Sequence, residues 1–394
     1  MITFDEALSR LLAEIQPLGR ETVRLDAAYG RFLAQDVVAG LASPRADVSA
    51  MDGYAVDLAS AEAGNWLQLV GEAAAGSPFE GTLDDTQAAR IFTGAFVPEG
   101  ADCVVMQEYA ERDGERVRFR EGFGPARHIR RKGGDFERGQ VLLTSGQRLT
   151  PRSMVALAGA DVSDAEVTKQ PRIAIIATGD ELHDPGTAHL SAHGLPESGS
   201  HGVAAMAQEC GAIIARLMRG RDDLAALSSL ARQALDMADC VVVIGGASVG
   251  DHDLARPMFD GTNMREVFAR IAIKPGKPVW FGIADGKPVL GLPGNPTSAM
   301  VTARLFLKPL LTAMQGGDGN SEIRFLPQVL AADLPANGSR ETFVRASAGP
   351  DGLTPAINQE SGAQAPLASS DWLIRRAPHA DPERAGKIAM ALPF

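Results

Sequence analysis

The chain has 394 residues, and its 38 basic and 49 acidic side chains give a formal net charge of −11. This acidic balance argues against a protein that holds nucleic acid or an anionic membrane surface through a broad cationic face. The hydrophobic content of 45% and the charged content of 22% are typical of a globular protein. A chain of this length is expected to form about two to four domains.

The cysteines and the N-terminal residues indicate a reducing compartment. Cys103, Cys210 and Cys240 are widely spaced, which favours neither a disulfide framework nor a CxxC metal site. The opening residues MITFDE place acids where a secretory signal carries bases. No stretch approaches the roughly 18 uninterrupted apolar residues of a membrane-spanning helix. We therefore expect a cytoplasmic protein.

The N-terminal part predicts helices on either side of a β-rich segment. A capping-box spacing at Thr3 and Glu6, followed by apolar residues at helical spacing, predicts an opening helix. Residues 21–40 also look helical. From residue 41 the chain changes to short alternating segments broken by glycine and proline, which favour strands. Another helix is expected at 151–160, where Pro151 suits a first-turn position.

Short apolar strands alternate with amphipathic helices between residues 171 and 315. This alternation predicts a parallel, doubly wound α/β sheet. From residue 323 onward, short segments broken by glycine, proline, asparagine and serine predict a small β domain. In the α/β part, the expected strands cover 172–177, 212–218, 240–244 and 267–273, a hairpin covers 278–292, and helices cover 203–210, 224–235 and 296–314.

Four loops follow these strands at the edge where open α/β sheets bind ligands. The turn at 293–296 lies just before a helix, whose free N–H groups and positive dipole end suit an oxyanion. Gly245, Gly246 and Ser248 form a similar turn with a hydroxyl group. Either turn alone is more often an ordinary helix entry, but their convergence with two further loops favours a binding site. The four loops cover 178–182, 245–253, 274–278 and 291–296.

Charged side chains on the same loops indicate a metal ion beside an anionic ligand. Lys274 and Lys277 add positive charge, whereas Glu181 and Asp253 would repel an anion unless a divalent cation bridged them. Mg²⁺ held jointly by carboxylates and by substrate phosphates satisfies both requirements. The residues therefore point to a phosphorylated ligand with a metal ion.

Seven ordered motifs resemble those of the MoeA family of molybdopterin molybdenumtransferases, which also includes the E domain of gephyrin. The resemblance covers the chain to about residue 315 and is weaker beyond it. The motifs are MDGYA at 51–55, TGA and PEGAD between 93 and 102, RRKGGD at 130–135, TGDEL at 178–182, GGASVGDHD at 245–253, KPGKP at 274–278 and PGNP at 293–296.

The resemblance implies a multidomain α/β protein that forms an elongated homodimer. It places the active site between the α/β domain of one subunit and the β-rich insert of the other. The expected parts are a doubly wound α/β molybdopterin-binding domain of residues 1–19 and 169–318, a linker domain of 20–40 and 138–168, a β-rich insert of 41–137 and a C-terminal β-barrel-like domain of 319–394.

The family reaction inserts molybdate into adenylylated molybdopterin and releases AMP, usually with Mg²⁺. Other cofactor-biosynthesis proteins and molybdoenzymes are expected as further partners. Catalytic positions carried over by motif are Asp52, Thr93, Asp135, Glu181, Asp222 and Asp253, of which Glu181 and Asp253 would hold the metal. Expected substrate-binding positions are Gly245, Gly246, Ser248, Lys274, Lys277, Pro293, Gly294, Asn295, Pro296, Arg345 and Ser361.

Some positions leave alternatives open. Asp222 is preferred over the neighbouring Asp223 by alignment alone. Gly199 stands where relatives usually carry asparagine, and Arg270 where they often carry lysine, which bears on ligand affinity rather than on reaction class. The basic run at 127–132 is either a solvated loop or a positively charged segment that attracts the anionic ligand to the region of Asp135.

Two other functions fit the same resemblance. One is a scaffolding or binding protein like the gephyrin E domain, and the other is adenylyl transfer to molybdopterin. Asp52, Glu181 and Asp253 together favour an enzyme, because a scaffold has no need of clustered acids. The β-rich insert and the C-terminal domain favour molybdate insertion over adenylyl transfer.

Overall fold

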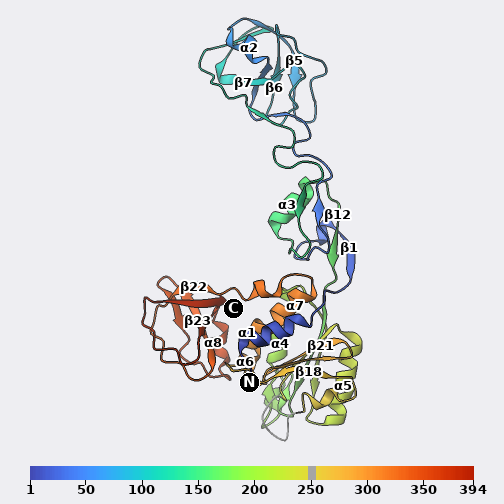
Figure 1. Ribbon diagram of the computed structural model, residues 1–394, viewed down its shortest axis with the longest axis vertical. Coiled ribbons are helices and arrows are strands. Elements are labelled where there is room, and N and C mark those ends of the chain that lie inside the picture. The colour runs from blue at the N-terminus through green and yellow to red at the C-terminus, as the bar shows by residue number, and fades with distance from the viewer. Residues whose placement is uncertain (247–253) are drawn as a thin grey trace.

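The computed structural model describes residues 1–246 and 254–394. The molecule is elongated, with a body at one end and the β-rich insert at the other (Figure 1). Helix α1 (Phe4–Ala13) lies in the body, from which the chain runs out to the insert and returns. Within the described ranges, no helix is both long and apolar enough to span a bilayer.

The α/β part is built on a six-stranded sheet with the order β16-β13-β17-β21-β20-β18. The first four strands are parallel, as expected, but β20 and β18 run antiparallel to their neighbours. Asp285 and Gly286 both have positive φ, which closes β20 and β21 into the predicted hairpin. The strands are β13 (Arg172–Thr178), β16 (Ile213–Gly220), β17 (Cys240–Ile244), β18 (Arg265–Ala269), β20 (Trp280–Ala284) and β21 (Lys287–Leu292).

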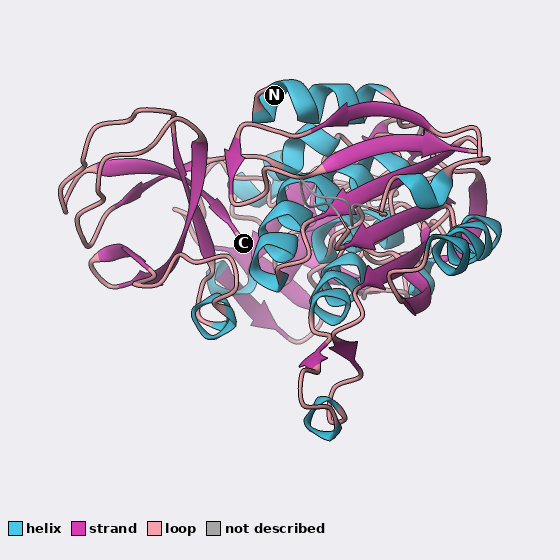
Figure 2. Ribbon diagram, turned by 90° about the horizontal axis from the view of Figure 1, so that it is seen from below, coloured by secondary structure: helices cyan, strands magenta, loops and turns pink. Residues whose placement is uncertain are grey.

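Helices cover both faces of this sheet (Figure 2). Along β17, Val242 faces an apolar cluster that contains α1 and α4, whereas Val241 and Val243 face a cluster that contains α5. A strand buried on both faces is apolar throughout, as the sequence here is. The helices are α4 (Gly199–Glu209), α5 (Leu224–Met237) and a stretch made of α6 (Pro296–Thr302), a π-helical segment (Ala303–Leu307) and α7 (Lys308–Met314).

The helix predicted at residues 21–40 is wrong. Strand β1 (Arg20–Arg24) pairs antiparallel with β12 (Asp164–Thr168), and helical backbone is limited to a 3₁₀ turn at Leu25–Ala27. The β-branched Thr22 lies in this ladder, opposite a strand more than a hundred residues away. Helical periodicity within a short window cannot reveal such a long-range partner.

The insert is β-rich, as predicted, with a six-stranded sheet in the order β7-β4-β6-β5-β9-β8. Shorter pairings, β3 with β10 and β2 with β11, continue toward the body. The domain boundaries given above stay predictions. The elements of the insert are β3 (Val48–Ser49), β4 (Gly53–Val56), α2 (Leu58–Glu62), β5 (Leu67–Ala73), β6 (Gln87–Ile91), β7 (Cys103–Met106), β8 (Ala110–Asp113), β9 (Arg116–Phe119) and β10 (Ile129–Arg130). Between the insert and the body, α3 (Pro151–Gly159) lies beside β12 (Figure 1) and shares an apolar cluster with β12, β2 (Val37–Val38) and β11 (Val141–Leu143).

The C-terminal residues form the predicted β part, but this sheet also takes a strand from the α/β part. Residues 267–273 were expected to form one strand; instead β18 ends at Ala269, Arg270 has a φ of 62°, and β19 (Ile273–Lys274) pairs with β23. The remaining elements are β22 (Leu326–Val329), β23 (Glu341–Gly349), β24 (Gly352–Pro355), α8 (Gln364–Ala368), β25 (Trp372–Arg376) and β26 (Ile388–Pro393).

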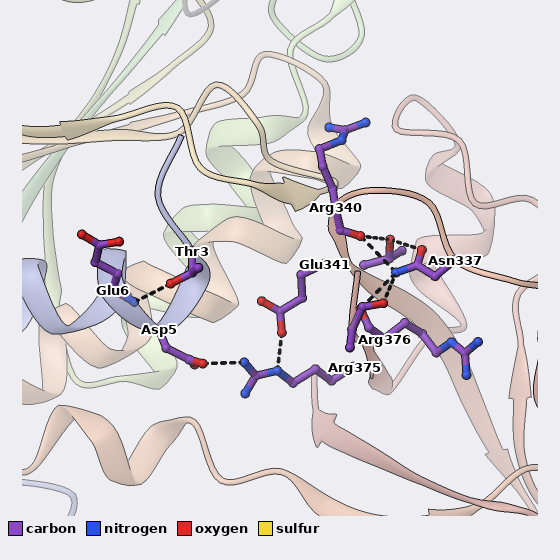
Figure 3. Close-up of polar contacts among 10 residues, drawn as sticks. Thr3, Asp5, Glu6, Asn337, Arg340, Glu341, Arg375 and Arg376 are labelled. Carbon is purple, nitrogen blue, oxygen red and sulfur yellow. Dashed lines mark hydrogen bonds and ion pairs between the residues drawn. The ribbon is translucent and has the colours of Figure 1, made fainter. Parts of the chain in front are cut away.

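Arg375 on β25 joins the N-terminal helix to the C-terminal sheet. Its guanidinium lies 2.8 Å from Asp5 of α1 and also contacts Glu341 of β23 (Figure 3). The same group lies over the rings of Phe325, at 4.9 Å, and Phe4, at 5.5 Å. Glu341 is buried, so the arginine supplies the counter-charge that a buried carboxylate requires.

We predict that Arg375→Met lowers the free energy of unfolding by about 2 kcal/mol, because it leaves Glu341 buried without a cation. Arg10→Met is the matched control, since Arg10 pairs with Glu6 on the exposed face of α1 and should contribute about 0.5 kcal/mol or less. Thermal unfolding of both variants checks the difference. Equal melting temperatures for the two variants would contradict the proposed contribution of the Arg375 contacts to the stability of the fold.

Candidate functional site

The carboxyl ends of β13, β17 and β21 surround a cavity of about 540 Å³. Three loops that are far apart in the sequence meet there, as expected at this edge of an α/β sheet. The cavity walls include polar groups, backbone turns and the start of α6. Of the predicted site residues, its lining contains Glu181, Asp222, Gly245, Gly246, Pro293, Gly294, Asn295 and Pro296.

Two glycines allow the loops to come this close. Gly179 has a φ of +149°, and a Cβ there would lie 2.6 Å from Oε2 of Glu181. Gly245 has a φ of +99°, and a Cβ there would lie 2.7 Å from the carbonyl oxygen of Thr178. Any larger residue would therefore push Glu181 or Thr178 out of place.

The neighbouring Asp222 and Asp223 have different surroundings. Asp222 lies in the cavity wall, and its backbone N–H donates to Oδ1 of Asp180 at 3.2 Å. The side chain of Asp223 instead accepts from the N–H of Ala226 at 2.8 Å and caps helix α5. This division of roles favours Asp222 as the site residue.

Several polar residues of the cavity wall were not among the predicted site residues. The hydroxyls of Thr178 and Ser198 belong to residues of this wall and are buried without a hydrogen-bond partner among the described residues. Glu197 accepts from the N–H of Ser200 at 2.8 Å and so caps α4. Thr178 is the first residue of the TGDEL motif, so the sequence could have indicated it as a site residue. Gln364 of α8 also lines the cavity, but no sequence pattern indicated that position.

A second hollow of about 830 Å³ adjoins the first and shares Pro278, Pro293 and Asn295 with it. Lys274 and Lys277 line this hollow, and both are exposed and form no ion pair with a described residue. These two lysines therefore present positive charge to a ligand.

The C-terminal part supplies the opposite wall of the second hollow. The side-chain amide of Asn295 donates to Oγ of Ser361 at 2.8 Å, and the hydroxyl of Thr297 donates to the carbonyl of Ala363 at 2.9 Å. These bonds join the start of α6 to residues 361–363. Asn295 and Ser361, predicted separately, thus meet.

Arg345 lies behind this wall rather than in it, which corrects its predicted place among the ligand-contacting residues. Its side chain is 1% exposed, and its guanidinium donates to the carbonyls of Asn358, Glu360 and Ala363 at 3.0–3.1 Å. Burial lowers the pKa of this arginine. Arg345 therefore shapes the loop that carries Ser361.

Asp52 and Thr93 adjoin β4 and β6 of the insert, Asp135 follows β10, and none of the three lines either hollow. Strand β6 lies at the opposite end of the molecule from β21 (Figure 1). Oδ1 of Asp52 accepts from the N–H and from the hydroxyl of Thr93, both at 2.8 Å. These two bonds lower the pKa of Asp52. Asp135 is exposed. Ser248 and Asp253 lie outside the described residues.

The basic run at 127–132 contains two ion pairs. Arg127 pairs with Asp102, and Nη1 of Arg131 lies 2.5 Å from Asp47. All four side chains are at least one-third exposed. These ion pairs favour the interpretation of the run as a solvated surface loop over its interpretation as a segment that attracts the anionic ligand.

The described residues contain no group of three or more histidine, cysteine, aspartate or glutamate side chains placed to hold a metal. Mg²⁺ bound with substrate phosphates needs only one or two protein carboxylates, because waters and phosphate oxygens complete its shell. Glu181 and Asp222 are two carboxylates in one cavity wall. They fit that requirement.

Comparison with known proteins gives matches along most of the chain. The family model described as the MoeA N-terminal region (domain I and II) matches residues 2–160, and that of a probable molybdopterin binding domain matches 174–313. A solved structure of a molybdopterin biosynthesis MoeA protein from Pyrococcus horikoshii has a TM-score of 0.83 and 27% identity, covering 100% of this chain and 99% of that one.

Named relatives agree with these matches. The molybdopterin molybdenumtransferase of Haemophilus influenzae is 35% identical over 319 residues, covering 80% of this chain and 78% of that protein. The protein of the same name from Staphylococcus aureus is 30% identical over 387 residues, covering 95% and 91%. The chain therefore has the MoeA fold and belongs to the molybdopterin molybdenumtransferase family, a family of transferases.

Proposed function

We propose that this protein inserts molybdate into adenylylated molybdopterin and releases AMP. The observation that carries the proposal is the pair of adjoining hollows. One contains carboxylates, buried hydroxyls and turns at strand ends, and the other contains two lysines that form no ion pair with any residue of the described ranges. Both face Asn295, so a diphosphate and an oxyanion bound in the two hollows would be neighbours.

The first hollow suits the diphosphate. Gly245 and Gly246 expose backbone at the end of β17, and the helical stretch that begins at Pro296 directs its free N–H groups to the same space. Glu181 and Asp222 are the residues that would hold Mg²⁺. When bound, this ion neutralises the phosphate oxygens and polarises the anhydride bond.

The second hollow suits molybdate, a tetrahedral oxyanion. Lys274 and Lys277 provide charge-assisted hydrogen bonds, and Ser361 offers a hydroxyl beside them. A molybdate oxygen attacks the adenylyl phosphorus, the phosphoanhydride bond to the molybdopterin phosphate breaks, and water then releases AMP from the molybdate, so the protein needs no side-chain nucleophile. The residues of the chain bind, orient and neutralise the two substrates.

A homodimer completes the site. Asp52, Thr93 and Asp135 line neither hollow of their own chain, and β6 of the insert lies at the opposite end of the molecule from β21 (Figure 1). Their action on substrate therefore requires the insert of a partner subunit. We place the reaction in the cytoplasm, in keeping with three buried cysteines that remain free thiols.

Incubation of the pure protein with adenylylated molybdopterin and Mg²⁺ tests the proposal. We expect AMP release that depends on added molybdate. A scaffolding protein would release no AMP. An adenylyltransferase would instead consume ATP and molybdopterin without any need for molybdate.

We predict that Asp222→Asn lowers molybdate-dependent AMP release by about a hundredfold, because it removes one charge from the metal-binding wall. The matched control is Asp223→Asn. Asparagine caps a helix about as well as aspartate, so this variant should keep nearly full turnover. The measurement is the steady-state rate of AMP formation as a function of Mg²⁺ concentration. Equal losses of turnover in Asp222→Asn and Asp223→Asn would contradict the assignment of Asp222 as the metal-binding residue.

A mixing experiment tests the shared site. Asp52→Asn and Asp222→Asn dimers should each be inactive, but their heterodimers contain one intact site because the two residues come from different subunits. After unfolding and joint refolding in equal amounts, about a quarter of the wild-type turnover should return. No recovery, despite heterodimers identified by affinity tags, would show that both residues act from one chain.

A further inference from the structure

Three strand ends of the insert meet at Asp52. Strand β4 begins directly after it and runs antiparallel to both β6 and β7, so the residues that follow β6 and β7 lie beside it. Thr93 follows β6 and binds the Asp52 carboxylate at 2.8 Å, whereas the N–H of Gln107, after β7, donates to the Asp52 carbonyl at 3.2 Å.

Arg90 connects these three ends. It lies opposite Tyr54 in the β4–β6 ladder, with its guanidinium 5.0 Å from the ring centre of Tyr54 and 4.8 Å from that of Phe92. One Nη donates to the carbonyl of Gly53 at 2.9 Å, and the other donates to Oε1 of Gln107 at 2.6 Å. The planar fork thus binds both Gly53, which follows Asp52, and Gln107, whose N–H donates to the Asp52 carbonyl.

The positive charge of Arg90 has no carboxylate partner in direct contact among the described residues, because its hydrogen bonds go to neutral oxygens. The N–H and then the hydroxyl of Thr93 lower the pKa of Asp52 most, and the charge of Arg90 acts in the same direction. Among the described residues, Arg90 is the charged group that produces such an effect on Asp52.

We propose that Arg90 is a positioning residue, which fixes the strand ends around Asp52 and so orients its carboxylate for the substrate bound by the partner subunit. This inference rests on the proposed function, which makes Asp52 part of the reacting site. Arg118 offers a matched comparison in the same sheet. Its guanidinium lies 4.8 Å from the ring centre of Trp66 and pairs with Glu111, without contact to Asp52.

The test compares Arg90→Gln, Arg90→Lys and Arg118→Gln in the full-length protein. We expect Arg90→Gln to lower kcat for molybdate-dependent AMP release by about tenfold to a hundredfold, because the carboxylate loses its fixed orientation. Arg90→Lys keeps the charge but loses the fork, so its kcat should lie between those of Arg90→Gln and the wild type. Arg118→Gln should keep wild-type kcat.

The pH profile separates positioning from folding. Removal of the positive charge raises the pKa of Asp52, so the acidic limb of kcat for Arg90→Gln should move to higher pH, whereas Arg90→Lys and Arg118→Gln should keep its position. In an Asp52→Asn background, Arg90→Gln should cause no further loss, because the group on which it acts is gone.

Each outcome is informative. An equal fractional loss in the Asp52→Asn background, or an unmoved acidic limb, would overturn the inference. If Arg90→Gln does not fold, Arg90→Lys replaces it in the double-variant test alone: its loss of kcat should disappear in the Asp52→Asn background, and an equal fractional loss there would overturn the inference. Wild-type kcat for Asp52→Asn would refute the proposed role of Asp52 itself, whereas low activity of Asp52→Asn with normal Arg90→Gln would refute only the role of Arg90.

Discussion

Parallel pairing of β13, β17 and β21 is the constraint on which the site depends. Parallel strands place their carboxyl ends at one edge, so the loops after Thr178, Ile244 and Leu292 meet although the chain separates them widely. The strands are buried on both faces, which fixes their register and thereby the positions of their ends. Acids, backbone turns and a helix start then share one cavity.

The C-terminal sheet extends this site through direct contacts with the α/β part. Strand β19 pairs with β23, Arg375 contacts Asp5, and Asn295 binds Ser361. Because Lys274 ends β19, the same pairing that joins the two sheets also places this lysine at the second hollow. The docking of the C-terminal sheet is therefore linked to the proposed binding of an oxyanion.

The sequence predicted the parts of this arrangement that depend on local pattern. Apolar runs located β13 and β17. Motif loops carried Glu181 and the turn at 293–296, and alignment carried Asp222, all of which line one cavity, while their roles stay predictions. Features set by distant partners were missed. The ladder of β1 with β12 replaced a predicted helix, the segment 267–273 divided between two sheets, and Arg345 turned inward to bind carbonyl oxygens.

A crystal structure of the protein with AMP, Mg²⁺ and molybdate tests the central claim most directly. We expect the nucleotide phosphate against the turns at 245–246 and 293–296, with the metal on Glu181 and Asp222. The oxyanion should lie between Lys274 and Ser361, with an insert from a second subunit covering both. Phosphate and oxyanion on separate faces of the molecule, with no shared wall at Asn295, would contradict the account.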